Sequence, residues 1–84
     1  MATITIECSV RYADAMCRAM LSIPTDERRE FGLEQCSTNC WSYAYDTTEY
    51  ESDDDYCERV DEFESMIEEA IAQYGIPEDE LWNI

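Results

Sequence analysis

The sequence contains no histidine and no lysine, and its 84 residues include only two glycines and two prolines. Without histidine, a cysteine or serine nucleophile would lack the imidazole group that commonly activates it. A glycine-rich phosphate loop and a G-x-S-x-G motif are also missing. These absences argue against the common catalytic arrangements. We therefore expect a protein that is not an enzyme, and we predict no catalytic residue and no cofactor.

Long apolar runs are missing too, since no segment approaches the roughly 20 residues of a membrane-spanning helix. The first residues, MATITIECSV, lack a basic region followed by a long apolar segment, so the sequence predicts no signal peptide. The scarcity of glycine and proline argues against a linker, while an apolar content of 45% is sufficient for a core. We therefore expect one domain over residues 1–84, in a cytoplasm and with no membrane partner.

Basic residues are scarce: five arginines face 21 aspartates and glutamates, which gives a net charge of −16. The charge is unevenly distributed, because residues 1–45 carry a net −2 and residues 46–84 a net −14. Such a chain repels nucleic acid and anionic lipid. The composition therefore disfavours direct nucleic-acid binding. It favours a partner with a basic surface, which in cells is most often the nucleic-acid-binding groove of another protein.

Two segments alternate between apolar and polar residues in the pattern typical of half-buried strands. In residues 3–10, the apolar side is formed by Ile4, Ile6, Cys8 and Val10. In residues 39–46, the aromatic side is formed by Trp41, Tyr43 and Tyr45. The short loop before the second strand predicts a hairpin in which Asn39 adopts a positive φ.

Two other segments have the helical period. Residues 11–22 share an apolar face formed by Tyr12, Met16, Ala19 and Met20, with Ala13, Cys17 and Leu21 beside it. In residues 52–74, Ser52 is the expected N-cap and Gly75 the expected C-terminal stop. The buried stripe of this long helix is formed by Tyr56, Val60, Phe63, Ile67, Ala70 and Tyr74.

Residues 25–36 allow two interpretations. Thr25 could cap a short helix with two acidic residues in its first turn. Alternatively, a turn leads into a strand from Glu30 to Cys36, with Phe31 and Leu33 facing inward. We favour the strand because the strand at 39–46 needs a neighbour. The remaining segments are expected to be a link over residues 47–52 and a final turn over 78–84 that returns Leu81, Trp82 and Ile84 to the core.

These elements follow the order β-α-β-β-α. The sequence therefore predicts an α+β domain in which a three-stranded sheet, antiparallel or mixed, is covered on one face by two helices.

Five cysteines are many for a chain of this length. Three of them, Cys8, Cys17 and Cys57, fall on apolar faces and are expected to be buried thiols. The other two, Cys36 and Cys40, flank the hairpin loop, where a zinc site or a local disulfide is an alternative to plain thiols. Because there is no histidine and no further free pair, we favour plain thiols and predict no metal ligand.

Acidic residues cover the outward face of the long helix, and many lie three or four positions apart. Each such like-charge pair costs roughly 0.2–0.5 kcal/mol, so the helix is not arranged for its own stability. Carboxylates one turn apart are about 5–6 Å from each other, which is comparable to the phosphate spacing in a nucleic acid. The predicted contacts with a basic partner are Asp53, Asp54, Asp55, Glu58, Asp61, Glu62 and Glu69, with Glu49, Glu51 and an exposed anchor, Tyr50, at the edge.

A small, very acidic, lysine-free chain with a charged helix beside a small sheet resembles the phage-encoded anti-defence proteins. These include anti-CRISPR and anti-restriction inhibitors, several of which imitate DNA. The resemblance rests on composition and on residues 46–69. It implies a non-enzymatic inhibitor in the host cytoplasm that occupies the basic nucleic-acid-binding site of a nuclease or CRISPR effector.

Two alternatives remain open at this point. An antitoxin-like or anti-sigma-like adaptor would grip a basic protein through the apolar stripe from Tyr56 to Tyr74, which also has the spacing of a helix-pairing seam. The chain could then be a monomer or a homodimer. The acidic face could instead be a solvated surface from the acid-rich proteome of a salt-loving source.

Overall fold

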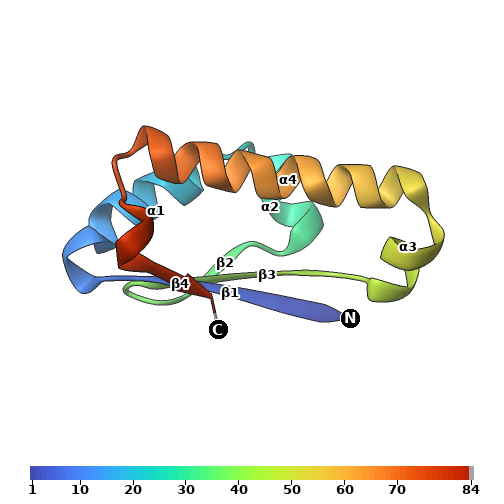
Figure 1. Cartoon of the computed structure of the whole chain (residues 1–84), viewed down its shortest axis with the longest axis horizontal. Coiled ribbons are helices and arrows are strands. Elements are labelled where there is room, and N and C mark those ends of the chain that lie inside the picture. The colour runs from blue at the N-terminus through green and yellow to red at the C-terminus, as the bar shows by residue number, and fades with distance from the viewer. Residues whose placement is uncertain (84) are drawn as a thin grey trace.

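The structure is a computed structural model that describes residues 1–83, and it has the α+β architecture predicted from the sequence. Four antiparallel strands form one sheet in the order β2-β3-β1-β4 (Figure 1). The strands are β1 (Ala2–Cys8), β2 (Glu34–Ser37), β3 (Cys40–Tyr45) and β4 (Leu81–Asn83). The helices are α1 (Ala13–Leu21), α2 (Thr25–Phe31), α3 (Thr47–Ser52) and α4 (Asp54–Gln73), with short 3-10 helices η1 (Val10–Tyr12) and η2 (Glu78–Glu80).

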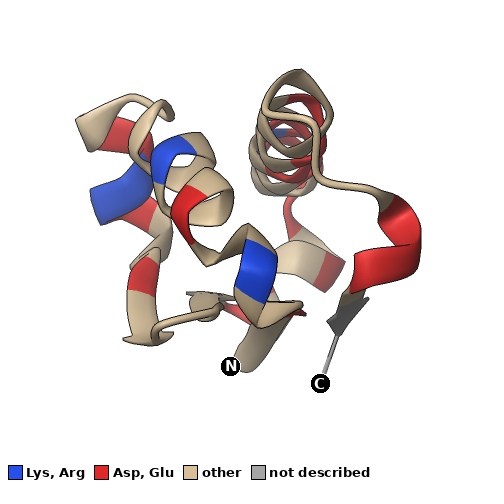
Figure 2. Cartoon of the chain, turned by 90° about the vertical axis from the view of Figure 1, so that its left-hand side faces the viewer, with Lys and Arg blue, Asp and Glu red and all other residues tan. Residues whose placement is uncertain are grey.

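The helices cover one face of the sheet. Helix α4 runs along the length of the strands, and α1 and α2 lie beside it over the same face (Figures 1 and 2). Helix α3 packs against the start of α4 at one end of the molecule. The two helices predicted from the sequence correspond to α1 and α4, while α2 and α3 are additional.

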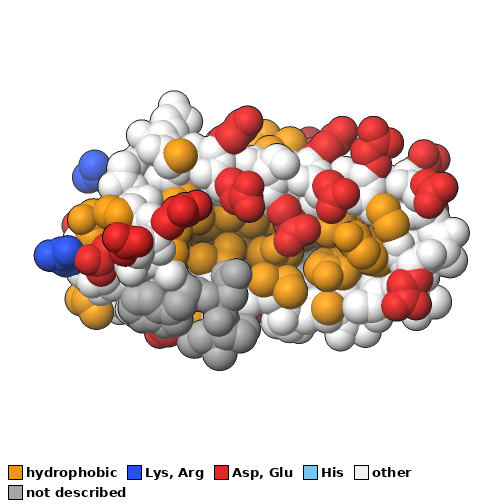
Figure 3. Space-filling model, viewed as in Figure 1, with side chains coloured by type: hydrophobic (Ala, Val, Ile, Leu, Met, Phe, Trp, Pro, Cys, Tyr) orange, Lys and Arg blue, Asp and Glu red, His pale blue; other side chains and the backbone are white. Residues whose placement is uncertain are grey.

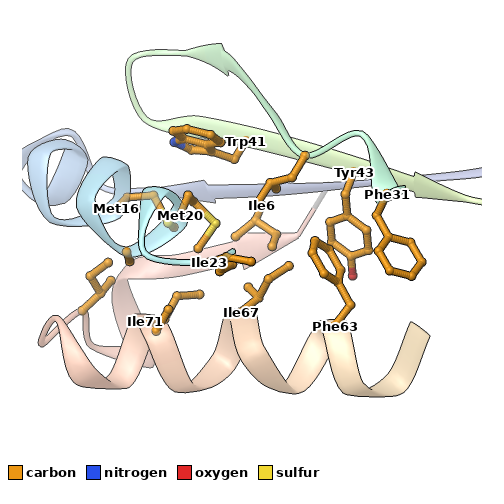
Figure 4. Packing of buried hydrophobic residues seen from close by; sticks show 14 of the residues in the cluster. Ile6, Met16, Met20, Ile23, Phe31, Trp41, Tyr43, Phe63, Ile67 and Ile71 are labelled. Atoms are coloured by element: carbon orange, nitrogen blue, oxygen red, sulfur yellow. The ribbon is translucent and has the colours of Figure 1, made fainter. Parts of the chain in front are cut away.

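The core lies between the sheet and the helices, where the apolar side of the strands faces the apolar side of the helices. From β1 and β3 come Ile6 and its cross-strand neighbour Trp41, both buried. From α4 comes Phe63, whose ring stacks on Phe31 at 4.5 Å and meets Tyr43 edge-on at 5.3 Å between ring centroids (Figure 4). Aromatic pairs in these geometries stabilise beyond their buried area, so this cluster ties α4 to α2 and β3.

Three apolar residues predicted to be buried are exposed, and each lies where an element ends. Val10 is outside β1, because the chain turns at Ser9 into η1. Leu21 is the last residue of α1, and the next apolar residue, Ile23, enters the core instead. Tyr74 follows the last turn of α4, and Ile71 takes its place in the buried stripe.

Residues 25–37 combine both interpretations of this segment. The preferred turn over its first half is wrong, because residues 25–31 form helix α2. Gly32 ends the helix at φ 63°, a conformation that glycine adopts without strain. Strand β2 then begins at Glu34, so the expected neighbour for β3 is present but shorter than predicted.

The hairpin between β2 and β3 does not depend on a positive φ at Asn39. Among the described residues, only glycines have positive φ. The side-chain amide of Asn39 instead donates to the carbonyl oxygen of Cys8 at 2.6 Å, and the Cys8 N–H donates to the Asn39 carbonyl at 2.9 Å. Asn39 therefore ties the hairpin to the end of β1.

The predicted link over residues 47–52 is helix α3, capped by the Asp46 carboxylate, which accepts from the Thr48 N–H at 2.9 Å. The expected N-cap Ser52 is wrong by one residue. Asp53 caps α4, and its carboxylate accepts from the N–H groups of Asp55 and Tyr56. Helix α4 ends at Gln73, beside the expected stop at Gly75, whose φ is 74°.

The chain after α4 forms a turn, as predicted, and then a fourth strand that was not predicted. Strand β4 pairs with the end of β1, with Leu81 opposite Cys8. Leu81 packs against the core, as expected. The predictions for the side chain of Trp82 and for Ile84 lie outside what the structure describes.

Candidate functional site: the acidic face of α4 and the groove beside it

Helix α4 has 20 residues and therefore spans about 30 Å of the molecule's 39 Å length. Its buried side is anchored by Val60, Phe63 and Ile67, each almost fully inaccessible to solvent. The acidic residues between these positions are therefore held outward by the helical period. All nine acidic residues predicted to contact a partner are exposed: Glu49, Glu51, Asp53, Asp54, Asp55, Glu58, Asp61, Glu62 and Glu69.

The structure brings four of these acids together. Glu58, Asp61, Glu62 and Glu69 line a shallow hollow of about 370 Å³ with Ser65 and Met66. The two acids of α3 lie at one end of the molecule, beside the N-terminus of α4 (Figure 1). Asp53 is partly committed to capping α4, so its carboxylate serves the helix before any partner. The central contact surface is therefore the middle of α4.

The single arginine of α4 does not neutralise this face. Arg59 forms an ion pair with Glu30 of α2, on the flank of α4 that faces the shorter helices. The arginines lie mainly on the side formed by η1, α1 and α2, whereas acidic residues follow α4 and η2 (Figure 2). The charge asymmetry of the sequence is thus also an asymmetry in space.

Tyr50 is not the exposed anchor that we predicted. Its side chain is half-buried, and its ring lies 5.1 Å from the ring of Tyr45. Its backbone carbonyl accepts from the Cys57 thiol of α4. Nearby Asp61, followed by desolvation, raises the pKa of the Tyr50 hydroxyl. Tyr50 therefore joins α3 to the sheet and to α4, and only part of its side chain is open to a partner.

The apolar stripe of α4 is not available as a pairing seam. Val60, Phe63, Ile67 and Ala70 are buried in the chain's own core. An adaptor or a homodimer that used this stripe would have to unpack the domain. The stripe therefore serves as a core face, and the adaptor hypothesis loses the surface on which it depended.

A second acidic row on α4 was not among the predicted contacts. Glu64 and Glu68 lie on the flank that faces β1 and β4, one helical turn apart. With Glu78 they border a groove of about 660 Å³ whose other described lining residues are apolar or aromatic. The sequence signal was present, because the core residues Ile67 and Ile71 occupy the same flank at the helical period. Only the fold shows that the sheet leaves this flank open.

Tyr43 lies in the wall of the groove and is bonded to this second row. Its hydroxyl donates to Oε2 of Glu64 at 2.6 Å, and its side chain is 4% exposed. Burial, followed by the hydrogen bond to the Glu64 carboxylate, raises the pKa of Tyr43 above its ordinary value of 10.0. The folded protein therefore holds the Tyr43 proton more tightly than the unfolded chain does.

This shift predicts an alkaline loss of stability. Below pH 10 the Tyr43 proton is bound in both the folded and the unfolded chain, so the contribution of Tyr43 to the free energy of unfolding is fully present. Above pH 10 the unfolded chain binds fewer protons, so the free energy of unfolding falls as pH rises. For Tyr43→Phe, we expect the free energy of unfolding to be lower by about 1 kcal/mol at pH 7. We also expect it to fall less steeply with pH above pH 10. Urea unfolding at several pH values measures both, and equal slopes in the two proteins would contradict the prediction.

All five cysteines are free thiols. Cys8 is buried, while Cys17 and Cys57 are half-buried. Cys36 is exposed and its Sγ lies 3.1 Å from Oγ of Ser42, whereas Cys40 is buried. The pKa values of the Cys8 and Cys40 thiols are raised, mainly by burial. A raised pKa makes these thiols poor nucleophiles. Within residues 1–83, no group of three or more potential ligands is arranged to hold a metal ion.

Comparison with protein-family models, with curated proteins and with solved structures found no match to the chain. The helices that the structure describes are all too short or too polar to cross a membrane. The candidate functional surfaces of the described residues are therefore the acidic outer face of α4 and the groove beside it.

Proposed function

We propose that this protein is a non-enzymatic inhibitor whose acidic α4 face occupies the basic nucleic-acid-binding site of a host defence effector, such as a nuclease or CRISPR complex. The observation that carries the proposal is the exposed acidic row on the middle of α4, from which the only arginine of the helix is turned away. In the host cytoplasm this face would act as a rigid imitation of a phosphate backbone.

The rigidity of the row supports this function. A helix whose opposite side is buried holds the backbone positions of these acids fixed without a partner. Association then costs side-chain freedom but requires no ordering of the backbone. Opposite charge also accelerates the encounter with a basic groove and makes it sensitive to salt.

The cost of the acidic row to folding stability also favours a functional surface over a merely solvated one. Like charges recur one turn apart along the row, each costing roughly 0.2–0.5 kcal/mol. Residues 1–45, which contain η1, α1 and α2, carry almost balanced charge. An adaptation of the whole surface to salt would be spread over both halves of the chain.

The test is capture from bacterial lysate with the immobilised protein at about 0.1 M salt and again at about 0.5 M, where charge interactions are strongly screened. We expect a nucleic-acid-binding effector that is retained at the lower salt, released at the higher salt and displaced by duplex DNA. A captured protein that resists both salt and DNA would contradict mimicry, because it would bind through another surface.

A further inference from the structure

The groove between α4 and the sheet has an apolar floor. Its lining residues include Ile4 and Ile6 of β1, Ile67 and Ile71 of α4, and Leu81 of β4. Figure 3 shows this floor as an open apolar strip between acidic side chains on one side and the edge of the sheet on the other.

The rim of the groove is acidic. Glu64 and Glu68 lie along its α4 side, and Glu78 lies where η2 begins. Among the described residues that line it, none is basic. An occupant therefore needs apolar groups for the floor and positive groups for the rim, which lysine and arginine side chains combine in an apolar stem and a charged tip.

The sheet edge beside the groove is incomplete. Strand β1 pairs with β3 from Ala2 to Glu7, but with β4 only from Ile6 to Cys8. On the β4 side, Ala2–Ile4 have no partner strand within residues 1–83. Such an edge presents unpaired backbone N–H and C=O groups, which can pair with a further strand.

We infer that this groove binds an extended, basic and apolar segment of the partner protein, which adds to the open edge of β1 as a strand. This deepens the proposed function and rests on it for the basic character of the partner. Side chains on one face of a strand repeat at about 6.5–7 Å. Carboxylates one helical turn apart, as in Glu64 and Glu68, are about 5–6 Å apart. Alternate residues of the added strand can therefore reach the rim and the floor.

The test uses a short synthetic peptide in which lysine and threonine alternate, so that lysines on one face repeat at about the spacing of the rim carboxylates and their apolar stems lie on the floor. Binding to the intact protein is measured by titration, and hydrogen exchange is followed at the amides of β1. The N–H groups of Ala2 and Ile4 face β3, as that of Cys8 does, so within this stretch only the Thr3 N–H faces the open edge. We therefore expect binding that slows exchange at the Thr3 amide. The same peptide N-methylated at every backbone amide keeps its side chains and charge but cannot donate to the edge, so we expect it to bind at least about tenfold more weakly.

Two matched protein variants separate the groove from general attraction to an acidic protein. Glu68→Lys changes the rim, whereas Glu34→Lys makes the same charge change on β2, at the opposite edge of the sheet. We expect Glu68→Lys to weaken peptide binding about three- to tenfold and Glu34→Lys to change it less than about twofold. Equal effects of the two variants, equal binding of the N-methylated peptide, or unchanged exchange at the Thr3 amide would overturn the inference.

The peptide experiment needs no effector, so its outcome is separable from that of the proposed function. Effector capture that responds to salt and DNA, together with failure of the peptide test, would overturn strand addition alone. Success of the peptide test without any such effector would overturn the nucleic-acid mimicry and leave the groove as a binding site for basic segments.

Discussion

Simultaneous replacement of Glu58, Asp61 and Glu62 with lysine is expected to abolish binding to the effector, with a loss of at least about a hundredfold in affinity. These three side chains lie in the centre of the exposed acidic row. Reversal would place positive charge against a basic groove and remove the carboxylates that imitate phosphates. Affinity measured by titration at about 0.1 M salt provides the readout.

The same triple variant is expected to be more stable than the natural chain by roughly 0.5–1 kcal/mol, because lysine would replace repulsion with attraction towards neighbouring acids such as Asp54 and Glu64. A rise in the free energy of unfolding, measured by urea denaturation, would show that binding was not lost through unfolding. Opposite effects on affinity and stability are typical of a surface that is retained for function.

A matched control changes the net charge by the same amount elsewhere. Asp14, Asp26 and Glu34 are exposed and lie on α1, α2 and β2. Their joint replacement with lysine should reduce affinity by no more than about threefold, through the weaker long-range field. Equal losses in the two triple variants would show that net charge matters and the α4 row does not.

Periodicity was sufficient to predict the elements that contribute most to the core. Alternation placed Ile6 and Trp41 inward, and the helical period placed Val60 and Phe63 inward, as observed. The strands and helices that carry these residues each have one buried and one exposed side, so burial repeats along the sequence with the period of the backbone. The exposed acids of α4 follow from the same period, which is why that part of the candidate site was predictable.

The features that periodicity missed depend on contacts between distant residues. Strand β4 has three residues, too few for a pattern, and exists because it pairs with β1 at the other end of the chain. Helix α3 has no apolar face and is held by the Asp46 cap and by packing of Tyr50 on Tyr45. The groove combines Ile4, Tyr43 and Ile71 from three elements, so no local pattern could have indicated it.

Phe63 supports both surfaces of α4, and its replacement with alanine is expected to destabilise the protein by about 3–5 kcal/mol. Its side chain is fully buried, stacks on Phe31 and meets Tyr43 edge-on. A chain of this length is stabilised by only about 4–13 kcal/mol, so the variant would lose a large part of its stability. Chemical denaturation measures the change.

Phe63→Leu provides the comparison, because leucine retains most of the apolar volume and loses the aromatic contacts. We expect it to cost about 1–2 kcal/mol and to leave effector affinity within about twofold, since the outer carboxylates keep their spacing when α4 stays folded. A leucine variant as unstable as the alanine variant would assign the stabilisation to ring geometry more than to volume. Normal stability of the alanine variant would contradict the core position of Phe63, and with it the packing that holds the acidic row outward.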